Sequence, residues 1–227
     1  MAYIIHIGDT PYSSWSLRGW LLLAAFDLPC DIRLHRMYDP AFAAFQRAAA
    51  PARTVPTLEW DQDGQPVRVW DSLAIAETLA ERHPAAGHWP EDPAARAAAR
   101  SLAAEMHSGF VALRQACPMN VRRKGVQPRA FANGTPESVA TDLSRLAAIW
   151  AWARGRWGAG GPFLFGARFT AADVFFAPVA FRVVGYGLVM EREALDYVAA
   201  LLAHPSVAAW RDMAFADERF IEDYERI

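Results

Sequence analysis

The chain has 227 residues, of which 53% are hydrophobic, so it is long enough to bury one large core or two smaller ones. Its formal net charge is -2, with acidic and basic residues mixed along the chain, which argues against nucleic acid as a partner because phosphate binding needs a basic surface. No apolar run reaches the length of a membrane span, and residues 1–10 lack the features of a signal peptide, so we expect a cytoplasmic protein with no membrane contact. Cys30 and Cys117 have no metal-ligand spacing and are too few for a disulfide scaffold, so we expect free thiols and no metal.

The first part of the chain alternates strand and helix patterns. Residues 3–7 are predicted as a strand and 16–26 as a helix, and a second strand over 31–37 follows the turn residues Leu28 and Pro29. Two strands joined by a helix indicate a parallel βαβ unit. The following patterns predict a short helix, a strand, a hairpin turn, a strand and a last helix, over residues 41–50, 55–60, 61–64, 67–70 and 71–82. The order βαβαββα is that of a compact α/β unit.

Beyond this unit no strand pattern returns. Residues 83–92 are rich in His, Pro and Gly, which is typical of a linker. Asp92 followed by Pro93 is a helix start, and the alanine-rich segment after it predicts one helix that runs to Cys117. Later helices are predicted from 135 to about 157, from 170, over 194–202 and over 205–213. The second part is therefore expected to be all helical.

Three hydroxyl groups, those of Ser13, Ser14 and Ser16, lie where the first strand gives way to the first helix. The backbone N–H groups at a helix N-terminus are free and the helix dipole favours negative charge, so this position stabilises an anion or a thiolate. Serine is also among the commonest N-cap residues, and from this stretch alone a capping role for Ser13 or Ser14 is the favoured interpretation.

Four motifs, taken in order, resemble the glutathione transferase superfamily over nearly the whole chain. They are residues 13–18, 53–58, 71–75 and 169–173. The resemblance implies an α/β thioredoxin-like N-terminal domain (βαβαββα) over residues 1–82, a linker over 83–92, and an all-α C-terminal domain over 93–227 that forms the second-substrate pocket. In the last motif, Thr170 and Asp173 are expected to form a capping box and to serve structure.

The segment 13–18 is similar to the Ser-Ser-Cys-Ser-Trp-Arg signature of the zeta class, with Trp15 where that class has cysteine. By this resemblance Ser13 takes the catalytic position, with Ser14 beside it. A free thiol has a pKa of about 8.5, so the thiol of glutathione is mostly protonated at neutral pH. A serine hydroxyl that donates a hydrogen bond to the sulfur, together with the helix dipole, favours the thiolate. The serine is then a donor and not itself the nucleophile.

The resemblance also implies which residues hold the rest of glutathione. A cis bond between Val55 and Pro56 turns the Val55 backbone toward the cysteinyl part of the tripeptide, whereas a trans proline at a strand start is the ordinary alternative. Asp71 suits the γ-glutamyl ammonium group and Ser72 its carboxylate, although both are equally good N-caps. Arg53 is the candidate for the glycyl carboxylate, with a solvated loop arginine as the alternative.

The second substrate is expected between the serine loop and the start of the helical domain. The candidate lining residues are spaced along one helix, namely Met106, His107, Phe110 and Arg114. Ordinary core packing is the favoured alternative for the apolar pair, and a packed or surface histidine for His107. Two further basic features are an exposed cluster at 122–124, which is more simply solvated, and Arg182. The zeta class, which isomerises maleylacetoacetate, uses an arginine in the corresponding helix, but Arg182 falls at a different spacing.

These features together predict a glutathione transferase that conjugates, isomerises or reduces a small electrophile, with glutathione as co-substrate. The alternative is a transferase-like protein that keeps the fold for binding or an adaptor role without catalysis. A thiol-disulfide oxidoreductase on the same fold needs a cysteine before the first helix, and the sequence has none there. The resemblance also implies a homodimer.

Overall fold

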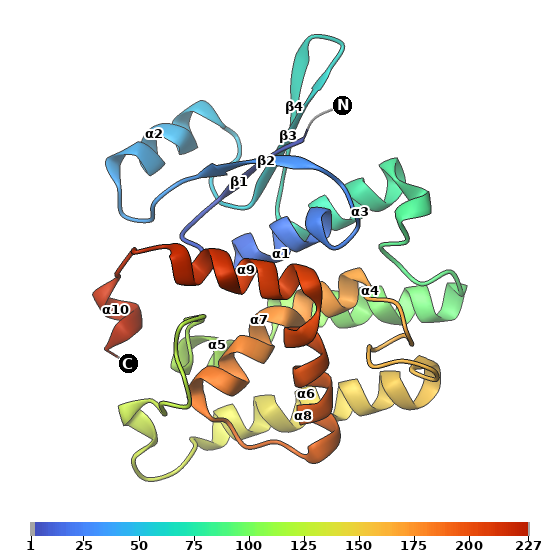
Figure 1. The fold of residues 1–227 in the computed structure, drawn as a ribbon, viewed down its shortest axis with the longest axis vertical. Helices are drawn as coiled ribbons and strands as arrows, with labels where there is room; N and C mark the ends of the chain where they lie inside the picture. The colour runs from blue at the N-terminus through green and yellow to red at the C-terminus, as the bar shows by residue number, and fades with distance from the viewer. Residues whose placement is uncertain (1–2, 227) are drawn as a thin grey trace.

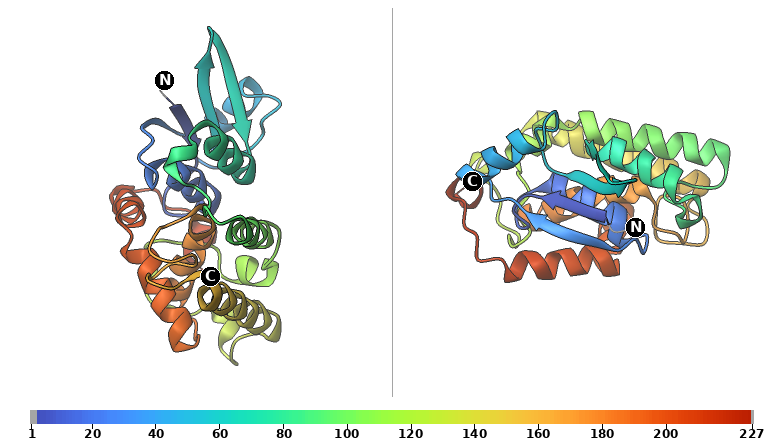
Figure 2. Two further views of the ribbon diagram at one scale, coloured as in Figure 1. Left: turned by 90° about the vertical axis from the view of Figure 1, so that its right-hand side faces the viewer. Right: turned by 90° about the horizontal axis from the view of Figure 1, so that it is seen from above.

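The protein is built as a sheet-containing part stacked on a helical part (Figure 1). The structure is a computed structural model and describes residues 3–226. Seen from the side, the strands and α3 lie at one end and the later helices at the other (Figure 2). The expected thioredoxin-like unit followed by a helical domain is confirmed. The predicted boundaries at 82, 92 and 93 stay a prediction, and residues 1, 2 and 227 of the predicted domains lie outside the described residues.

The first part holds a four-stranded sheet in the order β2-β1-β3-β4. Strands β1 and β2 are parallel, and β3 pairs antiparallel with both β1 and β4. The helices and strands of this part are β1 (Tyr3–Ile7), α1 (Ser14–Ala24), β2 (Cys30–Leu34), α2 (Pro40–Ala48), β3 (Thr57–Gln62), β4 (Gln65–Trp70) and α3 (Ser72–Arg82). This is the predicted order βαβαββα.

Local chemistry explains most of the boundaries in the sheet. Asp63 and Gly64 both have positive φ, which makes the two-residue hairpin turn between β3 and β4. Strand β3 begins at Thr57 and not at Val55 as predicted, because Pro56 has no N–H to donate to the ladder. The remaining predicted ends differ from the observed ones by up to three residues.

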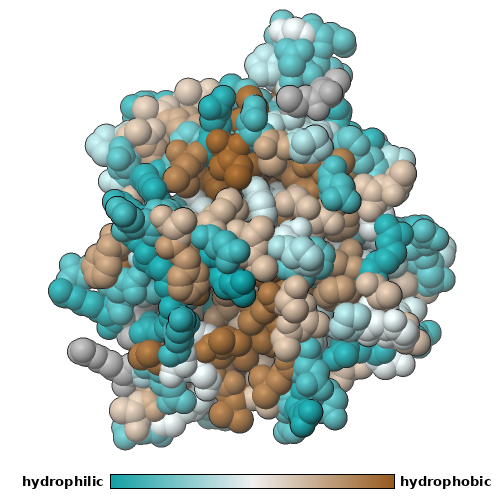
Figure 3. Space-filling view, viewed as in Figure 1, coloured by the Kyte–Doolittle hydropathy of each residue, from teal (hydrophilic) through white to brown (hydrophobic). Residues whose placement is uncertain are grey.

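Strand β2 is an edge of the sheet, and its outer side chains face away from the core. Ile32 is 39% exposed and Leu34 is 42% exposed. The face of the molecule that is seen in Figure 1 shows a hydrophobic patch on its sheet-containing half, with hydrophilic residues near it (Figure 3). The buried side chains lie on the other face of the sheet, which packs on α1 and α3.

Within the described residues the second part consists of helices and irregular connections, with one isolated β-bridge between Phe163 and Gly166. Its α-helices are α4 (Pro93–Ser108), α5 (Val111–Ala116), α6 (Glu137–Trp157), α7 (Ala171–Tyr186), α8 (Arg192–Ala203), α9 (Pro205–Ala216) and the four-residue α10 (Glu222–Glu225). Two short 3-10 helices, Pro84–Ala86 and Arg129–Phe131, lie in the connections. None of the helices in residues 3–226 is both long enough and apolar enough to cross a bilayer.

One predicted helix is wrong, because the segment after Asp92 is broken at Gly109 and does not run unbroken to Cys117. Gly109 adopts an extended conformation, and a Cβ there would lie 2.7 Å from the carbonyl oxygen of Glu105. Phe110, which follows, has a left-handed backbone with φ 55°. The break redirects the chain and gives α5 its own direction, which positions Arg114 differently from a residue on a continued α4.

The capping box at the start of α7 is confirmed. The backbone N–H and the hydroxyl of Thr170 each donate to a carboxylate oxygen of Asp173, both at 2.8 Å. The other oxygen of this carboxylate accepts from the backbone of Leu164 and from the hydroxyl of Tyr197. Asp173 is fully buried. The carboxylate therefore joins α7 to α8 and to the loop before α7, which is the structural role expected for it.

Candidate functional site

Three chain segments meet at one end of the sheet. In the register of the strands, His6 of β1 lies opposite Thr57 of β3, and Thr57 lies opposite Trp70 of β4. The residues that continue from this row are therefore neighbours, and they are the loop after β1, the Val55–Pro56 pair and the Asp71–Ser72 pair. The sheet thus gathers the motifs that are far apart in sequence.

The first of these segments is the serine loop, which we define as residues 9–16. Ser13 is the N-cap of α1, and its side-chain oxygen accepts a hydrogen bond from the backbone N–H of Ser16 at 3.2 Å. The Ser13 hydroxyl donates to the Ser16 hydroxyl at 2.7 Å, and Ser16 in turn accepts from the backbone N–H of Gly8 at 2.8 Å. Ser13 therefore caps α1, as the capping interpretation expected, and its hydroxyl proton is donated to Ser16.

Ser14, the first residue of α1, has a different environment. It is only half-buried, and its hydroxyl makes no hydrogen bond within residues 3–226. The first backbone N–H groups of α1 lie beside it, where the helix dipole favours negative charge. Of the two serines, Ser14 is the one with a hydroxyl free to donate to a bound group.

The peptide bond between Val55 and Pro56 is cis, as the resemblance implied. The pair lies beside the serine loop, since a Cβ built on Gly8 would be 3.3 Å from a methyl group of Val55 and 3.5 Å from the Ser13 hydroxyl oxygen. Pro56 is buried against α1, where a Cβ on Gly19 would lie only 2.3 Å from the Pro56 Cβ. This close approach of Pro56 to α1 holds the Val55 backbone next to Ser13.

Asp71 and Ser72 form the third segment. Asp71 has a positive φ of 74°, and its carboxylate caps α3 by accepting from the backbone N–H of Leu73 at 2.8 Å. The hydroxyl oxygen of Ser72 is buried and has no hydrogen-bond partner among residues 3–226. A buried hydroxyl without a partner is costly unless a ligand completes it. Arg53 is exposed on the loop between α2 and β3.

His107 lies beside Asp71. Its Nε2 is 3.3 Å from the Asp71 carboxylate, and its ring contacts the Trp15 indole edge-on with centroids 5.0 Å apart. Burial lowers the pKa of His107, the nearby Asp71 carboxylate raises it, and the charges of Arg18 and Arg114 lower it. His107 thus connects α4 of the helical part to the Asp71–Ser72 pair.

A cavity of about 280 Å³ opens on the side of the serine loop that faces the helical part. Its lining residues come from the serine loop, the loop after β2, α5, α7, the connection after α5 and the C-terminal segment. They are Tyr12, Ser13, Ser14, Trp15, Met37, Val111, Arg114, Gln115, Pro118, Met119, Arg182 and Tyr224. Of the four expected second-substrate residues, Arg114 lines this cavity. Met106 and Phe110 are buried in the core, at 0% and 6% exposed.

Arg114 and Arg182 line the cavity, and the buried Arg18 packs on Trp15, which also lines it. The hydrogen bonds of Arg18, Arg114 and Arg182 all go to backbone carbonyl groups. None of the ion pairs among the described residues includes them. Arg18 is stacked between the rings of Trp15 and Phe175, at 4.6 and 5.2 Å, and Arg114 lies 5.0 Å from the Trp15 centroid.

The positive charges of Arg18, Arg114 and Arg182 act on one another around the cavity. Burial and the charge of Arg114 lower the pKa of Arg182 to about 10. The pKa of Arg18 is lowered first by its complete burial and then by Arg182 and Arg114, with Asp71 acting in the opposite direction. Cations that repel one another in a partly desolvated site favour the binding of an anion.

Sequence reasoning missed residues that complete this site. Arg182 was identified only as an arginine at an unexpected spacing, and the C-terminal residue Tyr224 carried no signal at all. Arg122, expected to be solvated, instead donates hydrogen bonds to Tyr12 and Glu225. The charged residues after residue 216 are dense enough to suggest polar contacts, but such a composition is also typical of a frayed terminus.

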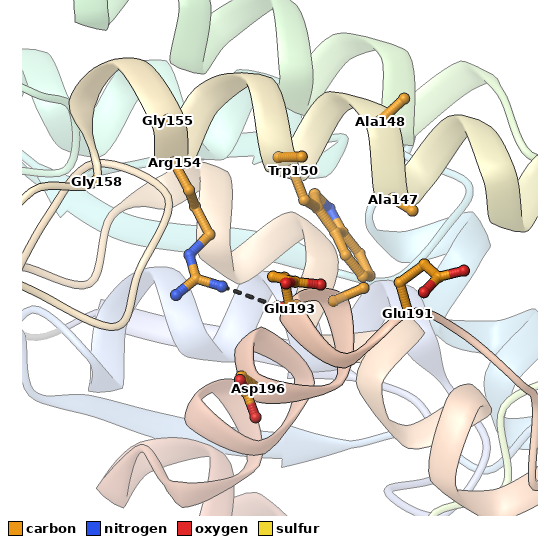
Figure 4. Close-up of a pocket in the computed structure, with 11 residues that line it drawn as sticks. Ala147, Ala148, Trp150, Arg154, Gly155, Gly158, Glu191, Glu193 and Asp196 are labelled. Carbon is orange, nitrogen blue, oxygen red and sulfur yellow. Dashed lines mark hydrogen bonds between the residues drawn. The ribbon is translucent and has the colours of Figure 1, made fainter.

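A larger cavity, of about 560 Å³, lies elsewhere, between α6 and α8 (Figure 4). Its described lining residues are mainly alanines, glycines and acidic side chains, with Trp150 and Arg154. Arg154 points toward α8 and donates to the backbone carbonyl of Glu193 at 2.9 Å (Figure 4). No hydroxyl, thiol or imidazole lies among these lining residues, so the smaller cavity beside the serines is the better candidate active site. Within residues 3–226 no three His, Cys, Asp or Glu side chains are grouped to hold a metal ion.

Comparison with known proteins agrees with the fold. The sequence matches the family models of the glutathione S-transferase N-terminal domain over residues 12–82 and C-terminal domain over residues 136–212. Comparison with curated proteins found no match. Among solved structures, a maleylacetoacetate isomerase from Anaeromyxobacter dehalogenans 2CP-1 with bound GSH is similar at 25% identity and a TM-score of 0.67, covering 96% of this chain and 98% of that one.

Two other solved structures share the fold. A glutathione transferase homolog from Burkholderia GL BGR1 with bound glutathione has 24% identity and a TM-score of 0.68, covering 96% of this chain and 100% of that one. Glutathione transferase Omega 1C from Trametes versicolor has 15% identity and a TM-score of 0.68, covering 95% and 94%. Since the models of both domains match in order, over residues 12–82 and 136–212, the protein belongs to the glutathione S-transferase superfamily.

Proposed function

We propose that the protein is a glutathione-dependent transferase or isomerase that activates the glutathione thiol at the serine loop. The observation that carries the proposal is the meeting, at one end of the sheet, of a free hydroxyl on Ser14, the cis Val55–Pro56 bond and the unpartnered buried hydroxyl of Ser72. Each of these suits a different part of the tripeptide. The glutathione bound in similar structures supports the same ligand.

In the proposed mode of binding, the Ser72 hydroxyl donates a hydrogen bond to the γ-glutamyl carboxylate, and the Asp71 carboxylate pairs with the ammonium group. The Val55 backbone pairs with the cysteinyl backbone, and Arg53 binds the glycyl carboxylate. The sulfur then lies near the N-terminus of α1. The resemblance further supports a homodimeric, cytoplasmic protein with domain boundaries at residues 82 and 93.

The Ser14 hydroxyl donates to the sulfur, and with the helix dipole it lowers the pKa of the thiol from about 8.5 toward neutrality. Ser13 acts as the cap that holds the loop, because its proton is engaged by Ser16. Sulfur is then the nucleophile. On an electron-poor alkene, sulfur forms a bond to one carbon, the π electrons move to the adjacent carbon, and that carbon takes a proton from water.

The roles of the two serines are separated by Ser13→Ala and Ser14→Ala. Ser14→Ala is expected to lower kcat about tenfold to a hundredfold and to raise the apparent pKa of the pH-rate profile, since a hydrogen bond to a charged group is lost. Ser13→Ala is expected to lower the free energy of unfolding by about 1 kcal/mol, as a lost N-cap. Steady-state kinetics and urea unfolding measure the two effects. Unchanged turnover in the double variant would remove the serines from the mechanism.

We further propose that the second substrate is a small electrophile that carries an anionic group. The cavity beside Ser14 presents Arg114 and Arg182, whose charges no carboxylate of the described residues neutralises. Guanidinium groups bind carboxylates with two parallel hydrogen bonds, which gives both affinity and orientation. A carboxylate held there would place the neighbouring reactive carbon near the sulfur.

Maleate and dimethyl maleate test this charge preference, because they share the reactive double bond and differ in charge. The wild-type protein is expected to favour maleate relative to their uncatalysed rates with glutathione. Arg114→Met is expected to reduce kcat/KM for maleate about tenfold and to leave the value for dimethyl maleate within about twofold, while Arg114→Lys retains part of the preference. Equal losses for both substrates would show that Arg114 does not bind the anionic group.

A further inference from the structure

The C-terminal segment, residues 217–226, is tied to the serine loop by a dense set of polar contacts. The carboxylate of Asp217 accepts from the Thr10 hydroxyl at 3.0 Å and from Arg36 at 2.6 Å. Arg36 also donates to the fully buried Asp9 at 3.0 Å, and Arg219 lies 3.7 Å from the same carboxylate. These contacts join the end of the chain to its beginning.

The last turn is held by a second cluster around Glu225. One oxygen of its carboxylate accepts from the Tyr12 hydroxyl at 2.6 Å and from Arg122 at 3.0 Å. The other oxygen accepts from the Asn120 side chain at 2.9 Å. Arg122 also donates to the Tyr12 hydroxyl and to the carbonyl groups of Asp217 and Arg219, at 3.0 and 2.7 Å for the two carbonyls. Glu225 therefore connects the serine loop, the chain after α5 and the C-terminal segment through one side chain.

The same segment forms part of the cavity wall. Tyr224 lines the cavity with Tyr12, and the centroids of their rings are 5.0 Å apart. Tyr12 directly precedes Ser13, so any displacement of the C-terminal segment would move the residues that precede the cap of α1. Glu225 of the segment pairs with Arg122, and Arg219 of the segment lies 3.7 Å from Asp9 of the serine loop. The cavity residues Arg114 and Arg182 have no such partner among residues 3–226.

We propose that the C-terminal segment is a substrate-selecting strap, in which Glu225 is a positioning residue that holds the serine loop and Tyr224 limits the length of the electrophile. The inference rests on the proposed function for its kinetic test, since the selectivity concerns the second substrate of the same site. Its physical basis is that a wall pinned by several charge-assisted hydrogen bonds resists expansion, so a longer substrate must displace it at a cost in binding.

The kinetic test uses maleate diesters of increasing length, because dimethyl and dibutyl maleate share one reactive bond. The variants are Tyr224→Ala, Glu225→Gln and a chain that ends at Ala216. The wild-type protein is expected to favour the dimethyl ester. In the shortened chain and in Tyr224→Ala, the ratio of kcat/KM for dimethyl over dibutyl ester is expected to fall by about fivefold or more, and Glu225→Gln is expected to change it in the same direction. The matched control is Glu222→Gln, which removes a carboxylate that pairs only with Arg226 and is expected to leave the ratio unchanged.

A second measurement is independent of turnover. Hydrogen exchange of the amides in residues 9–16, followed by mass spectrometry, is expected to be faster in Glu225→Gln and in the shortened chain than in the wild type, with no change in Glu222→Gln. If neither maleate nor its esters react with the wild-type protein, the proposed function fails while faster exchange still supports the positioning role. An unchanged ester ratio in folded variants, or unchanged exchange of the serine loop, would overturn the strap.

Discussion

Single residues decide how closely the elements around the site approach one another. Gly19 faces Pro56, and a Cβ at this position would lie 2.3 Å from the Pro56 Cβ. The segment was predicted correctly as a helix from the spacing of its apolar residues, but this spacing carries no information about Pro56. The need for glycine at position 19 therefore becomes visible only when Pro56, just before β3, is packed against α1.

Gly19→Ala is expected to destabilise the fold by about 1 to 3 kcal/mol, because overpacking at Pro56 outweighs the gain in helix propensity. Gly155→Ala is the matched control. Gly155 is also inside a helix, but a Cβ there meets nothing within 4 Å, so this variant is expected to stabilise the fold by about 0.5 to 1 kcal/mol. Urea unfolding of both variants measures the opposite signs. A destabilised Gly155→Ala variant would show that the comparison does not isolate the contact with Pro56.

At the scale of elements, helix α2 is attached to the sheet through a stack of aromatic rings. His6 of β1 and His35, just after β2, are joined by a 2.9 Å hydrogen bond between ring nitrogens. The His35 ring stacks on Phe45 of α2 with centroids 3.9 Å apart. Burial, followed by the charge of His35, lowers the pKa of His6 from 6.5 to about 4, and burial also lowers the pKa of His35.

The stack predicts an acid sensitivity of the fold. Because the folded state keeps His6 neutral, the unfolded chain binds its proton first as the pH falls, so stability present above pH 6.5 is lost progressively toward pH 4. The melting temperature measured by circular dichroism is expected to fall over this range. His6→Phe, which keeps an aromatic ring for stacking, is expected to show a smaller fall. An identical pH dependence in the variant would assign the acid sensitivity to other groups.

At the scale of the whole molecule, the two parts share one hydrophobic core. One connected cluster of buried hydrophobic side chains includes residues of both parts, from Tyr3 in β1 to Ala214 in α9. Polar contacts cross the same boundary, since Arg18 of α1 donates to the Phe175 carbonyl and Trp210 of α9 donates to the Thr10 carbonyl. The linker-like composition of residues 83–92 predicts a boundary between the two parts, but it does not reveal how extensively they pack together.

This shared core predicts that the protein unfolds in one step. Calorimetry is expected to show a single transition, because exposing the face of α1 that packs on α7 would also expose the core of the helical part. The transition is expected to move to higher temperature with millimolar glutathione, because the proposed glutathione site exists only in the folded state. Two separate transitions, one shifted by glutathione and one not, would show that the parts unfold independently.

Much of the fold follows from short-range patterns in the sequence. Asp92 followed by Pro93 starts α4, Thr170 with Asp173 starts α7, and Asp63 with Gly64 makes the hairpin turn, because caps and turns depend on neighbouring residues alone. The break at Gly109 was missed, since the alanine-rich pattern favours a helix on both sides of it.

The candidate site, too, was predicted in part from the sequence and was decided in part by the packing of the elements. The motifs containing Ser13, Ser14, Val55 and Ser72 could be recognised in the sequence, because each is a short run at the end of one element. Only the tertiary structure showed that Ser13 is committed to Ser16 and that Arg114, Arg182 and Tyr224 line one cavity with Ser14. The physical reason is that α1, α5, α7 and the C-terminal segment converge by burying a common core. The directions of their side chains follow from that packing, and periodicity along the chain does not encode it.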